Sequence, residues 1–99
     1  MVKLKSLVDA PTRSRALFLD RDGVINVNHG YVHNVRNFEF IAGIFDLARI
    51  AHANDFKIVV ITNQSGIGRG LYSEEQFYQL TFWMCKEFLN AGAPIDKVY

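Results

Sequence analysis

Two stretches of the chain are continuously apolar, and both have the composition of buried β-strands. Residues 16–19 form the first, and residues 58–61, which are mostly β-branched, form the second. Strands of a parallel sheet have this pattern when helices cover the sheet, because neither face then alternates with polar residues. The pattern predicts two parallel strands, with a third beginning in residues 95–99 after Pro94.

Apolar residues at helical spacing predict a helix after each of the first two strands. The first helix lies within residues 43–55 and ends near Asn54; its apolar positions are Ile44, Leu47, Ala48 and Ala51. The second begins after Ser73, which stands three residues before Gln76 as in a capping box, and Gly92 follows its end. Its expected buried stripe is Phe77, Leu80, Met84 and Phe88.

The order strand, helix, strand, helix, strand predicts an α/β fold, a Rossmann-like three-layer α/β/α arrangement with a parallel sheet. A chain of 99 residues has room for one domain. We assign residues 16–99 to this domain. Residues 1–15 are rich in Lys and Arg and lack the apolar segment of a signal peptide, so we expect them to be a flexible leader.

Composition excludes several classes of protein. The net charge is +1 and 49% of the residues are hydrophobic, which argues against a large nucleic-acid or anionic-membrane surface. No apolar run has the length of a membrane helix, so we expect a cytoplasmic protein with no membrane or nucleic-acid partner. The single cysteine, Cys85, excludes an internal disulfide and a Cys-based zinc site within this chain, and its position favours a buried thiol.

Two loops at the ends of the predicted strands are the candidate functional segments. Residues 20–40 make a connection far longer than the usual βα loop, and residues 62–70 (TNQSGIGRG) directly follow the second strand. Parallel strands share a direction, so both loops leave the sheet at the same edge. Function in α/β proteins is concentrated at this edge.

The first loop opens with two aspartates, Asp20 and Asp22, whose side chains project to the same side of an extended chain. Two such close carboxylates either share a proton or bind a cation, and Mg²⁺ accepts one or two carboxylates together with phosphate oxygens. With one Asp ionised and the other protonated, the pair can attack phosphorus and protonate the leaving oxygen, through an aspartyl-phosphate. Gly23 allows a sharp turn after the pair.

The second loop offers groups that bind phosphate oxygens. Thr62 ends the second strand as Asp20 ends the first, and amides and glycine-freed N–H groups follow it. Other interpretations are weaker. Residues 20–31 lack the glycine and final Glu of a calcium loop, and GIGRG is neither a dinucleotide fingerprint nor a P-loop. His29 and His33 are poor metal-pair candidates, and Arg69 is equally a phosphate contact or a solvated side chain.

An apolar strand ending in DRDGV, followed some 40 residues later by one ending in TNQSG, resembles the first two motifs of the haloacid dehalogenase-like phosphohydrolases. LDRDGVIN, HGYV, NFEF and VVITNQSGIGRG are similar to the subgroup that acts on heptose bisphosphates and histidinol phosphate. The resemblance covers about residues 16–99. It implies a truncated part of that fold, and an Mg²⁺-dependent phosphatase acting on a small phosphorylated sugar.

The resemblance also implies roles for individual residues. Asp20 is then the nucleophile, Asp22 is the general acid and base, and Thr62 holds the phosphoryl group. Asp20 binds the metal through its carboxylate, and Asp22 binds it through its backbone carbonyl. The implied substrate contacts are Asn28, His29, Gly30, Tyr31, Asn63, Gln64 and Ser65. Asn28 departs from the Asp that we expect there, which puts one sugar hydroxyl contact in doubt.

In family members, later segments supply a catalytic lysine, a further acidic pair and a structural Zn²⁺ loop. The 99 residues do not include these later motifs. We therefore expect the chain to be the N-terminal half of a longer, monomeric enzyme and to have little activity by itself. Histidinol-phosphate phosphatase and a non-catalytic phosphate-binding module remain the alternatives.

Overall fold

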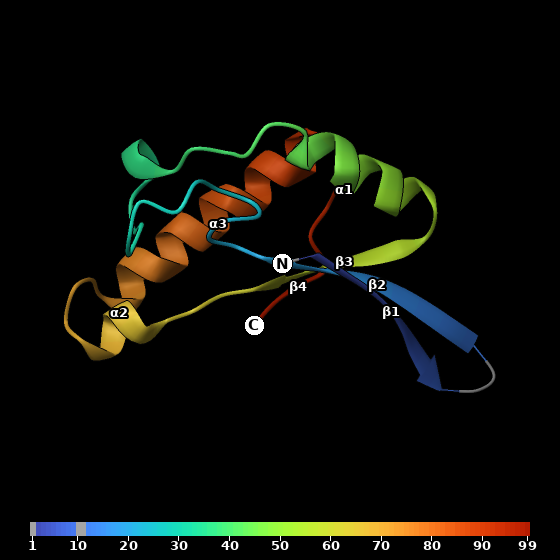
Figure 1. Ribbon diagram of the computed structural model, residues 1–99, viewed down its shortest axis with the longest axis horizontal. Coiled ribbons are helices and arrows are strands. Elements are labelled where there is room, and N and C mark those ends of the chain that lie inside the picture. The colour runs from blue at the N-terminus through green and yellow to red at the C-terminus, as the bar shows by residue number, and fades with distance from the viewer. Residues whose placement is uncertain (1, 10–11) are drawn as a thin grey trace.

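The structure is a computed structural model that describes the backbone of residues 2–9 and 12–99 and the side chains from Arg15 onward. The elements follow the chain in the order β1 (Val2–Asp9), β2 (Thr12–Asp20), a 3₁₀ helix η1 (Val35–Asn37), α1 (Ile44–Ala53), β3 (Phe56–Ile61), α2 (Ser65–Gly68), α3 (Glu74–Asn90) and β4 (Lys97–Val98). Figure 1 shows their arrangement.

The four strands form one sheet in the order β1-β2-β3-β4. β2, β3 and β4 are parallel, which confirms the predicted sheet, whereas β1 pairs antiparallel with β2. The apolar pattern predicts no strand before residue 16, so β1 and the start of β2 are additions to the expected sheet. Because residues 2–9 and 12–15 have mixed polar and apolar character, they lack the continuous apolar pattern by which the other strands were found. The boundary at residue 16 and the flexibility of the leader stay predictions.

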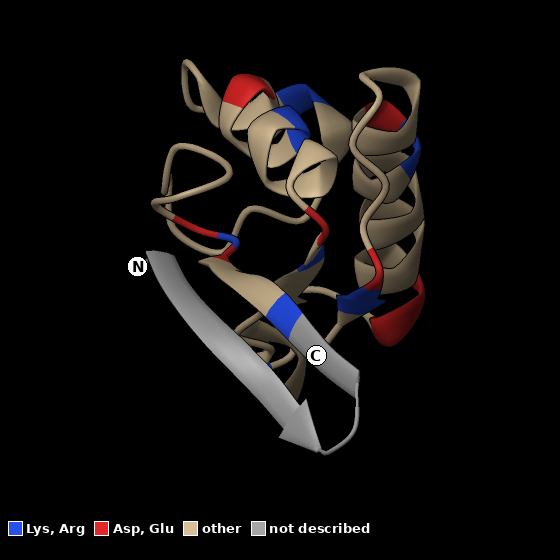
Figure 2. Ribbon diagram, turned by 90° about the vertical axis from the view of Figure 1, so that its right-hand side faces the viewer, with Lys and Arg blue, Asp and Glu red and all other residues tan. Residues whose placement is uncertain are grey.

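Both long helices lie on the same face of the sheet (Figures 1 and 2). Each strand-helix-strand unit is right-handed by preference, and the two units step along the sheet in the same direction, so their helices fall on one side. The predicted parallel sheet with crossover helices is thus confirmed. The described residues contribute one helical layer, and the second layer of the expected α/β/α arrangement stays a prediction.

The core lies between this helical layer and the sheet. Leu17 and Leu19 of β2 and Ile58 and Val60 of β3 are almost fully buried against the helices. The helices contribute mainly Ala48, Ala51, Leu80, Met84 and Phe88. The predicted stripe of α3 is confirmed, but Leu47 of α1 is 37% exposed because the buried face of that helix is centred on Ile44, Ala48 and Ala51.

The ends of α3 follow the local signals in the sequence. Ser73 and Gln76 form the complete capping box, and Gly92 has a φ of 84°, a left-handed conformation that favours glycine. Cys85, on the same helix, is half-buried, and desolvation raises the pKa of its thiol. A raised pKa lowers the thiolate fraction, which is unfavourable for a reactive cysteine.

Candidate active site

The ends of β2 and β3 bring the predicted catalytic residues together. Asp20 is in register with Ile61, and the backbone N–H of Arg21 donates to the carbonyl of Ile61 at 2.9 Å. Thr62 therefore follows β3 beside the start of the acid pair. A cavity of about 340 Å³ at this edge is lined by Asp20, Arg21, Asp22, Asn28, Ile61, Thr62 and Asn63.

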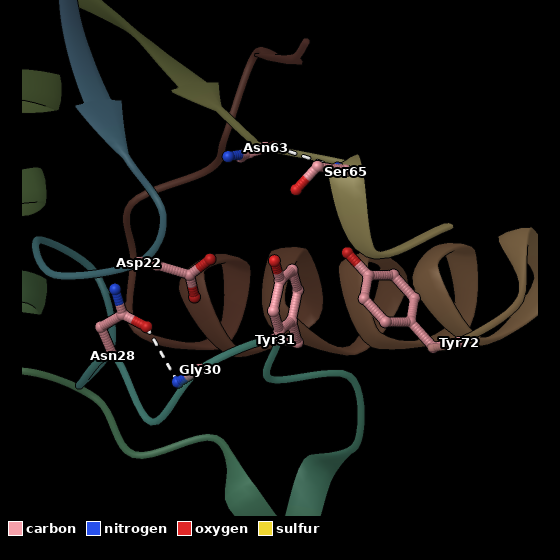
Figure 3. Close-up of a pocket in the computed structure, with 7 residues that line it drawn as sticks. All are labelled: Asp22, Asn28, Gly30, Tyr31, Asn63, Ser65 and Tyr72. Atoms are coloured by element: carbon pink, nitrogen blue, oxygen red, sulfur yellow. Dashed lines mark hydrogen bonds between the residues drawn. The ribbon is translucent and has the colours of Figure 1, made fainter. Parts of the chain in front are cut away.

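A second cavity, of about 250 Å³, adjoins the first, since Asp22, Asn28 and Asn63 line both. Its complete lining is Asp22, Asn28, Gly30, Tyr31, Asn63, Ser65 and Tyr72. Figure 3 shows these residues around a common space, with the carboxylate of Asp22 beside the ring of Tyr31. We call the two cavities together the acid-pair pocket.

A tight turn directs the acid pair into this pocket. The carbonyl of Arg21 accepts hydrogen bonds from the N–H groups of Ile25 at 2.9 Å and Asn26 at 3.1 Å, and Gly23 has a φ of 92°. Ile25 is fully buried in the core, and this packing holds the turn in place. The expectation that Gly23 allows a sharp turn is confirmed.

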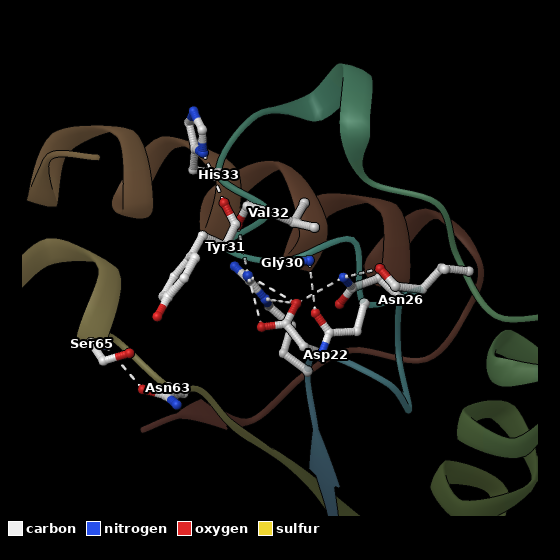
Figure 4. Close-up of polar contacts among 11 residues, drawn as sticks. Asp22, Asn26, Gly30, Tyr31, Val32, His33, Asn63 and Ser65 are labelled. Carbon is white, nitrogen blue, oxygen red and sulfur yellow. Dashed lines mark hydrogen bonds and ion pairs between the residues drawn. The ribbon is translucent and has the colours of Figure 1, made fainter. Parts of the chain in front are cut away.

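The carboxylate of Asp22 is held from two directions (Figure 4). Its Oδ1 accepts from Arg21 Nη2 at 3.1 Å and from Asn26 Nδ2 at 2.9 Å, and its Oδ2 accepts from Arg21 Nη2 at 3.2 Å. Arg21 and Asn26 are buried, whereas the Asp22 side chain is 22% exposed. The second aspartate is thus a fixed carboxylate that still reaches the pocket.

The long loop after the acid pair is ordered by its two ends and by aromatic packing. The N–H of Val27 donates to the carbonyl of Glu39 at 2.8 Å, and that of Ile41 to Ile25 at 2.8 Å. Phe38 and Phe40 both contact Trp83 of α3, each with ring centroids 5.5 Å apart. These contacts keep residues 28–31 at the pocket rim.

Matching turns form the two rims of the pocket. On the β2 side, Asn28 Oδ1 accepts from the N–H of Gly30 at 3.0 Å; on the β3 side, Asn63 Oδ1 accepts from the N–H of Ser65 at 3.0 Å. Each Asn thus shapes its own loop.

Thr62 has contacts on both its hydroxyl and its backbone. Thr62 Oγ1 donates to the carbonyl of Tyr99 at 2.6 Å, and Thr62 N donates to the same carbonyl at 2.9 Å. A hydroxyl has only one proton, so donation to a phosphate oxygen requires the hydroxyl to turn from Tyr99 towards the pocket.

Tyr72 closes the far end of the pocket, and glycine makes its position possible. A Cβ on Gly66 would lie 2.1 Å from Cε1 of the Tyr72 ring, far inside contact distance. The ring is buried and stacks on His33, with centroids 5.4 Å apart and planes within 8°. The GIGRG segment therefore has a packing role that its sequence did not reveal.

Two of the proposed substrate-contact residues are not among those that line the pocket. His29 is about half exposed, and its Nε2 lies 3.5 Å from Oε1 of Glu39. Gln64 is exposed and contacts Thr62 Oγ1 at 3.5 Å through Nε2. The other proposed residues, Asn28, Gly30, Tyr31, Asn63 and Ser65, do line it. The roles of all these residues stay predictions.

The donor set fits a hard cation that needs few protein ligands. Asp20 and Asp22 are the carboxylates of the pocket lining, and among the residues that the structure describes no group of three or more His, Cys, Asp or Glu side chains is placed to hold a metal. Mg²⁺ meets this condition because it keeps several waters and binds through one or two carboxylates and phosphate oxygens.

Sequence reasoning missed three residues of this site, Arg21, Asn26 and Tyr72. Arg21 and Asn26 stand in the DRDGVIN motif, so their position beside the acid pair was a usable signal. Tyr72 offered no such signal, because it follows a glycine-rich stretch that is typical of a loop.

Among the described residues, no helix is both long and apolar enough to cross a membrane.

The fold matches that of solved had-like phosphatase structures over about half of their length. A solved had-like structure from Mesorhizobium loti matches with a TM-score of 0.80 and 29% identity, over 98% of this chain and 47% of that chain. The D,D-heptose 1,7-bisphosphate phosphatase from B. bronchiseptica, solved with magnesium and phosphate, matches with a TM-score of 0.77 and 26% identity, over 83% of this chain and 46% of that one.

The curated homologues at about 50% identity are heptose-1,7-bisphosphate 7-phosphatases, some named for the alpha and others for the beta anomer. The Burkholderia mallei D-glycero-alpha-D-manno-heptose-1,7-bisphosphate 7-phosphatase is 55% identical over 87 residues, which are 88% of this chain and 46% of the relative. The chain spans about half the length of the curated relatives it matches. No protein-family model matches the chain.

Proposed function

We propose that the chain carries the nucleophile half of a magnesium-dependent phosphatase that removes the phosphate at C7 of D-glycero-D-manno-heptose 1,7-bisphosphate. The observation that carries the proposal is the convergence of Asp20, Asp22 and Thr62 on one cavity at the carboxyl ends of β2 and β3. The names of the curated homologues support the substrate class.

In the proposed reaction Asp20 attacks phosphorus and the ester bond to the C7 oxygen breaks. Asp22, protonated at that moment, gives its proton to the departing sugar oxygen, so the sugar leaves as a neutral alcohol. A water then attacks the phosphorus of the aspartyl-phosphate and loses a proton to Asp22 as the bond to Asp20 breaks. Free phosphate leaves and both aspartates return to their starting states.

The remaining groups of the pocket bind and orient the substrate. Thr62 holds a phosphoryl oxygen once its hydroxyl turns from Tyr99, and the rims at Asn28 and Asn63 lie where sugar hydroxyls approach. The Asp20 carboxylate and the backbone carbonyl of Asp22 would hold magnesium, which would neutralise phosphate charge. The relatives carry both anomer names, so the proposal covers the shared C7 ester and not the anomer.

The test measures phosphate release from heptose 1,7-bisphosphate with and without magnesium. It uses the 99-residue chain and, beside it, the chain joined to the sequence that the Burkholderia relative has outside the match. We expect magnesium-dependent release of one phosphate by the joined protein. The chain alone should be slow, since the pocket lining contains no lysine to stabilise phosphate charge.

Two variants distinguish the nucleophile from a bystander. Asp20→Asn in the joined protein should lower turnover on the order of 10⁴-fold or more, because the amide cannot attack phosphorus. Hydroxylamine trapping should capture an acyl-phosphate in the unmodified protein and not in this variant. Asp46→Asn, an exposed change on α1, is the control and should leave turnover unaltered.

The alternatives appear as outcomes of the same assay. Faster release from histidinol phosphate than from the heptose bisphosphate would reassign the substrate. Tight phosphate binding without turnover, unaffected by Asp20→Asn, would support a non-catalytic binding module and contradict the proposal.

Three further parts of the proposal rest on the sequence. We place the protein in the cytoplasm because these 99 residues contain no extended apolar segment, and we propose a monomer on the basis of the family resemblance. A structural Zn²⁺ site belongs, if present, to residues outside this chain, because Cys85 is its only cysteine. Subcellular fractionation, sedimentation and metal analysis of the joined protein test these statements.

A further inference from the structure

Arg21, the residue between the two aspartates, has an unusual environment for an arginine. Its side chain is only 3% exposed, and its guanidinium carbon lies 5.8 Å from the centroid of the Phe38 ring. A buried guanidinium is costly unless an anion and hydrogen-bond acceptors surround it. The contacts that compensate this charge therefore indicate what the side chain does.

The guanidinium links the acid pair to the substrate loop through one nitrogen. Nη2 of Arg21 donates to both carboxylate oxygens of Asp22, at 3.1 and 3.2 Å, and to the backbone carbonyl of Val32 at 2.8 Å. Nε adds a longer contact to Asp22 Oδ1 at 3.3 Å. Val32 is buried and directly follows Tyr31 of the pocket lining. The position of the loop and the orientation of Asp22 thus depend on the same group.

Asn26 fixes the same carboxylate from another direction. Its side chain is fully buried, and Nδ2 donates to Asp22 Oδ1 at 2.9 Å and to the carbonyl of Val27 at 3.1 Å. The reverse orientation of the amide would set its oxygen against the carboxylate, which is repulsive. Among the described residues, Oδ1 of Asp22 therefore accepts from three donor atoms, whereas Oδ2 accepts from one, Arg21 Nη2 at 3.2 Å.

We infer that Arg21 is a positioning residue for proton transfer by Asp22. With Asn26 it holds Oδ1 in place and leaves Oδ2 to exchange the proton with the leaving oxygen. It also fixes residues 28–32 relative to that carboxylate. This inference rests on the proposed function, because it assigns a supporting group to the general acid of that reaction. In this role Arg21 acts through Asp22, and its side chain also lines the first cavity.

The leaving group of the substrate separates this role from a merely structural one. An alkyl phosphate such as the heptose ester needs a proton from Asp22 when its bond breaks, whereas the nitrophenolate of p-nitrophenyl phosphate departs without one. In the first step, which kcat/KM reports, a misplaced Asp22 therefore slows the alkyl ester far more than p-nitrophenyl phosphate, whereas the later hydrolysis of the aspartyl-phosphate uses Asp22 as a base for both substrates. A general loss of structure slows both alike.

The experiment compares Arg21→Met, Arg21→Lys and a control, Arg36→Met, in the form of the protein that is active in the assay above. Arg36 is an exposed arginine of the same long loop. For Arg21→Met we expect kcat/KM for the heptose ester to fall on the order of 100-fold, with a loss of less than about 10-fold for p-nitrophenyl phosphate. Arg21→Lys should recover part of the difference, because it restores a cation without the planar fork. Arg36→Met should match the unmodified protein.

A second readout does not depend on catalysis. Hydrogen exchange of the amides in residues 28–33 should be faster in Arg21→Met and unchanged in Arg36→Met. If Arg21→Met does not fold, Asn26→Ala replaces it. This variant removes one donor to Oδ1, and a smaller loss, about 10-fold and again confined to the alkyl ester, is expected.

Equal losses on the two substrates in folded variants, or no loss on either, would overturn the inference while leaving the phosphatase itself established. If the unmodified protein hydrolyses neither substrate, the proposed function fails instead. The two failures are therefore distinguishable.

Discussion

The two walls of the acid-pair pocket are built in different ways. On the β2 side, Asp22 is fixed by the buried side chains of Arg21 and Asn26. On the β3 side, Asn63 and Ser65 are exposed and are shaped by a hydrogen bond within their own turn. The first wall depends on buried charge and the second on local turn geometry. The difference suggests that the β2 wall is rigid before the substrate arrives, whereas the β3 wall has room to adjust around the phosphate.

Among the changes that compare the two walls, the largest effect should come from removing the charge of Asp22 on the β2 wall. Asp22→Asn leaves Arg21 without its anion, so we expect a loss of about 3 kcal/mol in the free energy of unfolding. Turnover of the alkyl ester should fall on the order of 10² to 10⁴-fold, because the amide does not transfer the proton. Urea unfolding and steady-state kinetics measure the two losses.

The matched control for this change is Asp46→Asn, which removes an equally direct ion pair to Arg49 on α1. Both partners are exposed there, so the expected loss in stability is below about 1 kcal/mol. Equal destabilisation by the two changes would mean that the β2 wall gains nothing from its burial.

On the β3 wall, Thr62→Val removes the hydroxyl that donates to Tyr99 and retains the shape of the side chain. We expect kcat/KM to fall about 100-fold through loss of one phosphate contact, with a change in unfolding free energy of about 1 kcal/mol. Thr62→Ser keeps the hydroxyl and should retain most activity. Loss of activity in the Ser variant equal to that in the Val variant would contradict a role for the hydroxyl.

The packing of Tyr72 against α2 gives a test of stability. Gly66→Ala places a Cβ where the Tyr72 ring lies and should destabilise the fold by about 1 to 3 kcal/mol. Gly68→Ala in the same short helix meets no atom within 4 Å, so it should be neutral or slightly stabilising. Thermal unfolding of both variants checks this, and a neutral Gly66→Ala would show that the ring moves freely.

The smallest effects should come from the two rim turns. Asn28→Asp and Asn63→Asp keep the oxygen that accepts from Gly30 or Ser65, so stability should change by less than about 0.5 kcal/mol. Each adds a negative charge to the lining. For Asn63→Asp, KM for the bisphosphate should rise about five-fold, as expected for one unit charge near the surface. Asn28→Asp restores the Asp that the family resemblance predicts at this position, so its KM should rise less. A rise confined to one variant would identify the rim that the phosphate approaches.

The sequence alone was sufficient for those parts of the fold that depend on near neighbours. Continuous apolar runs located β2 and β3, and the capping box of Ser73 and Gln76 located the start of α3. The motif after β2 also identified the acid pair, because alternation along a strand places Asp20 and Asp22 on one side. These signals extend over a few residues, and each can be read without knowing the rest of the chain.

The tertiary structure alone decided which side chains the pocket receives. The link from Arg21 to Val32 spans 11 residues, and it forms because Phe38 and Phe40 pack on Trp83 and close the loop. The same closure puts His29 at the surface beside Glu39, while Gly66 makes room for Tyr72. Local propensity carries no information about such contacts, because they are set by the packing of segments that are distant in the sequence.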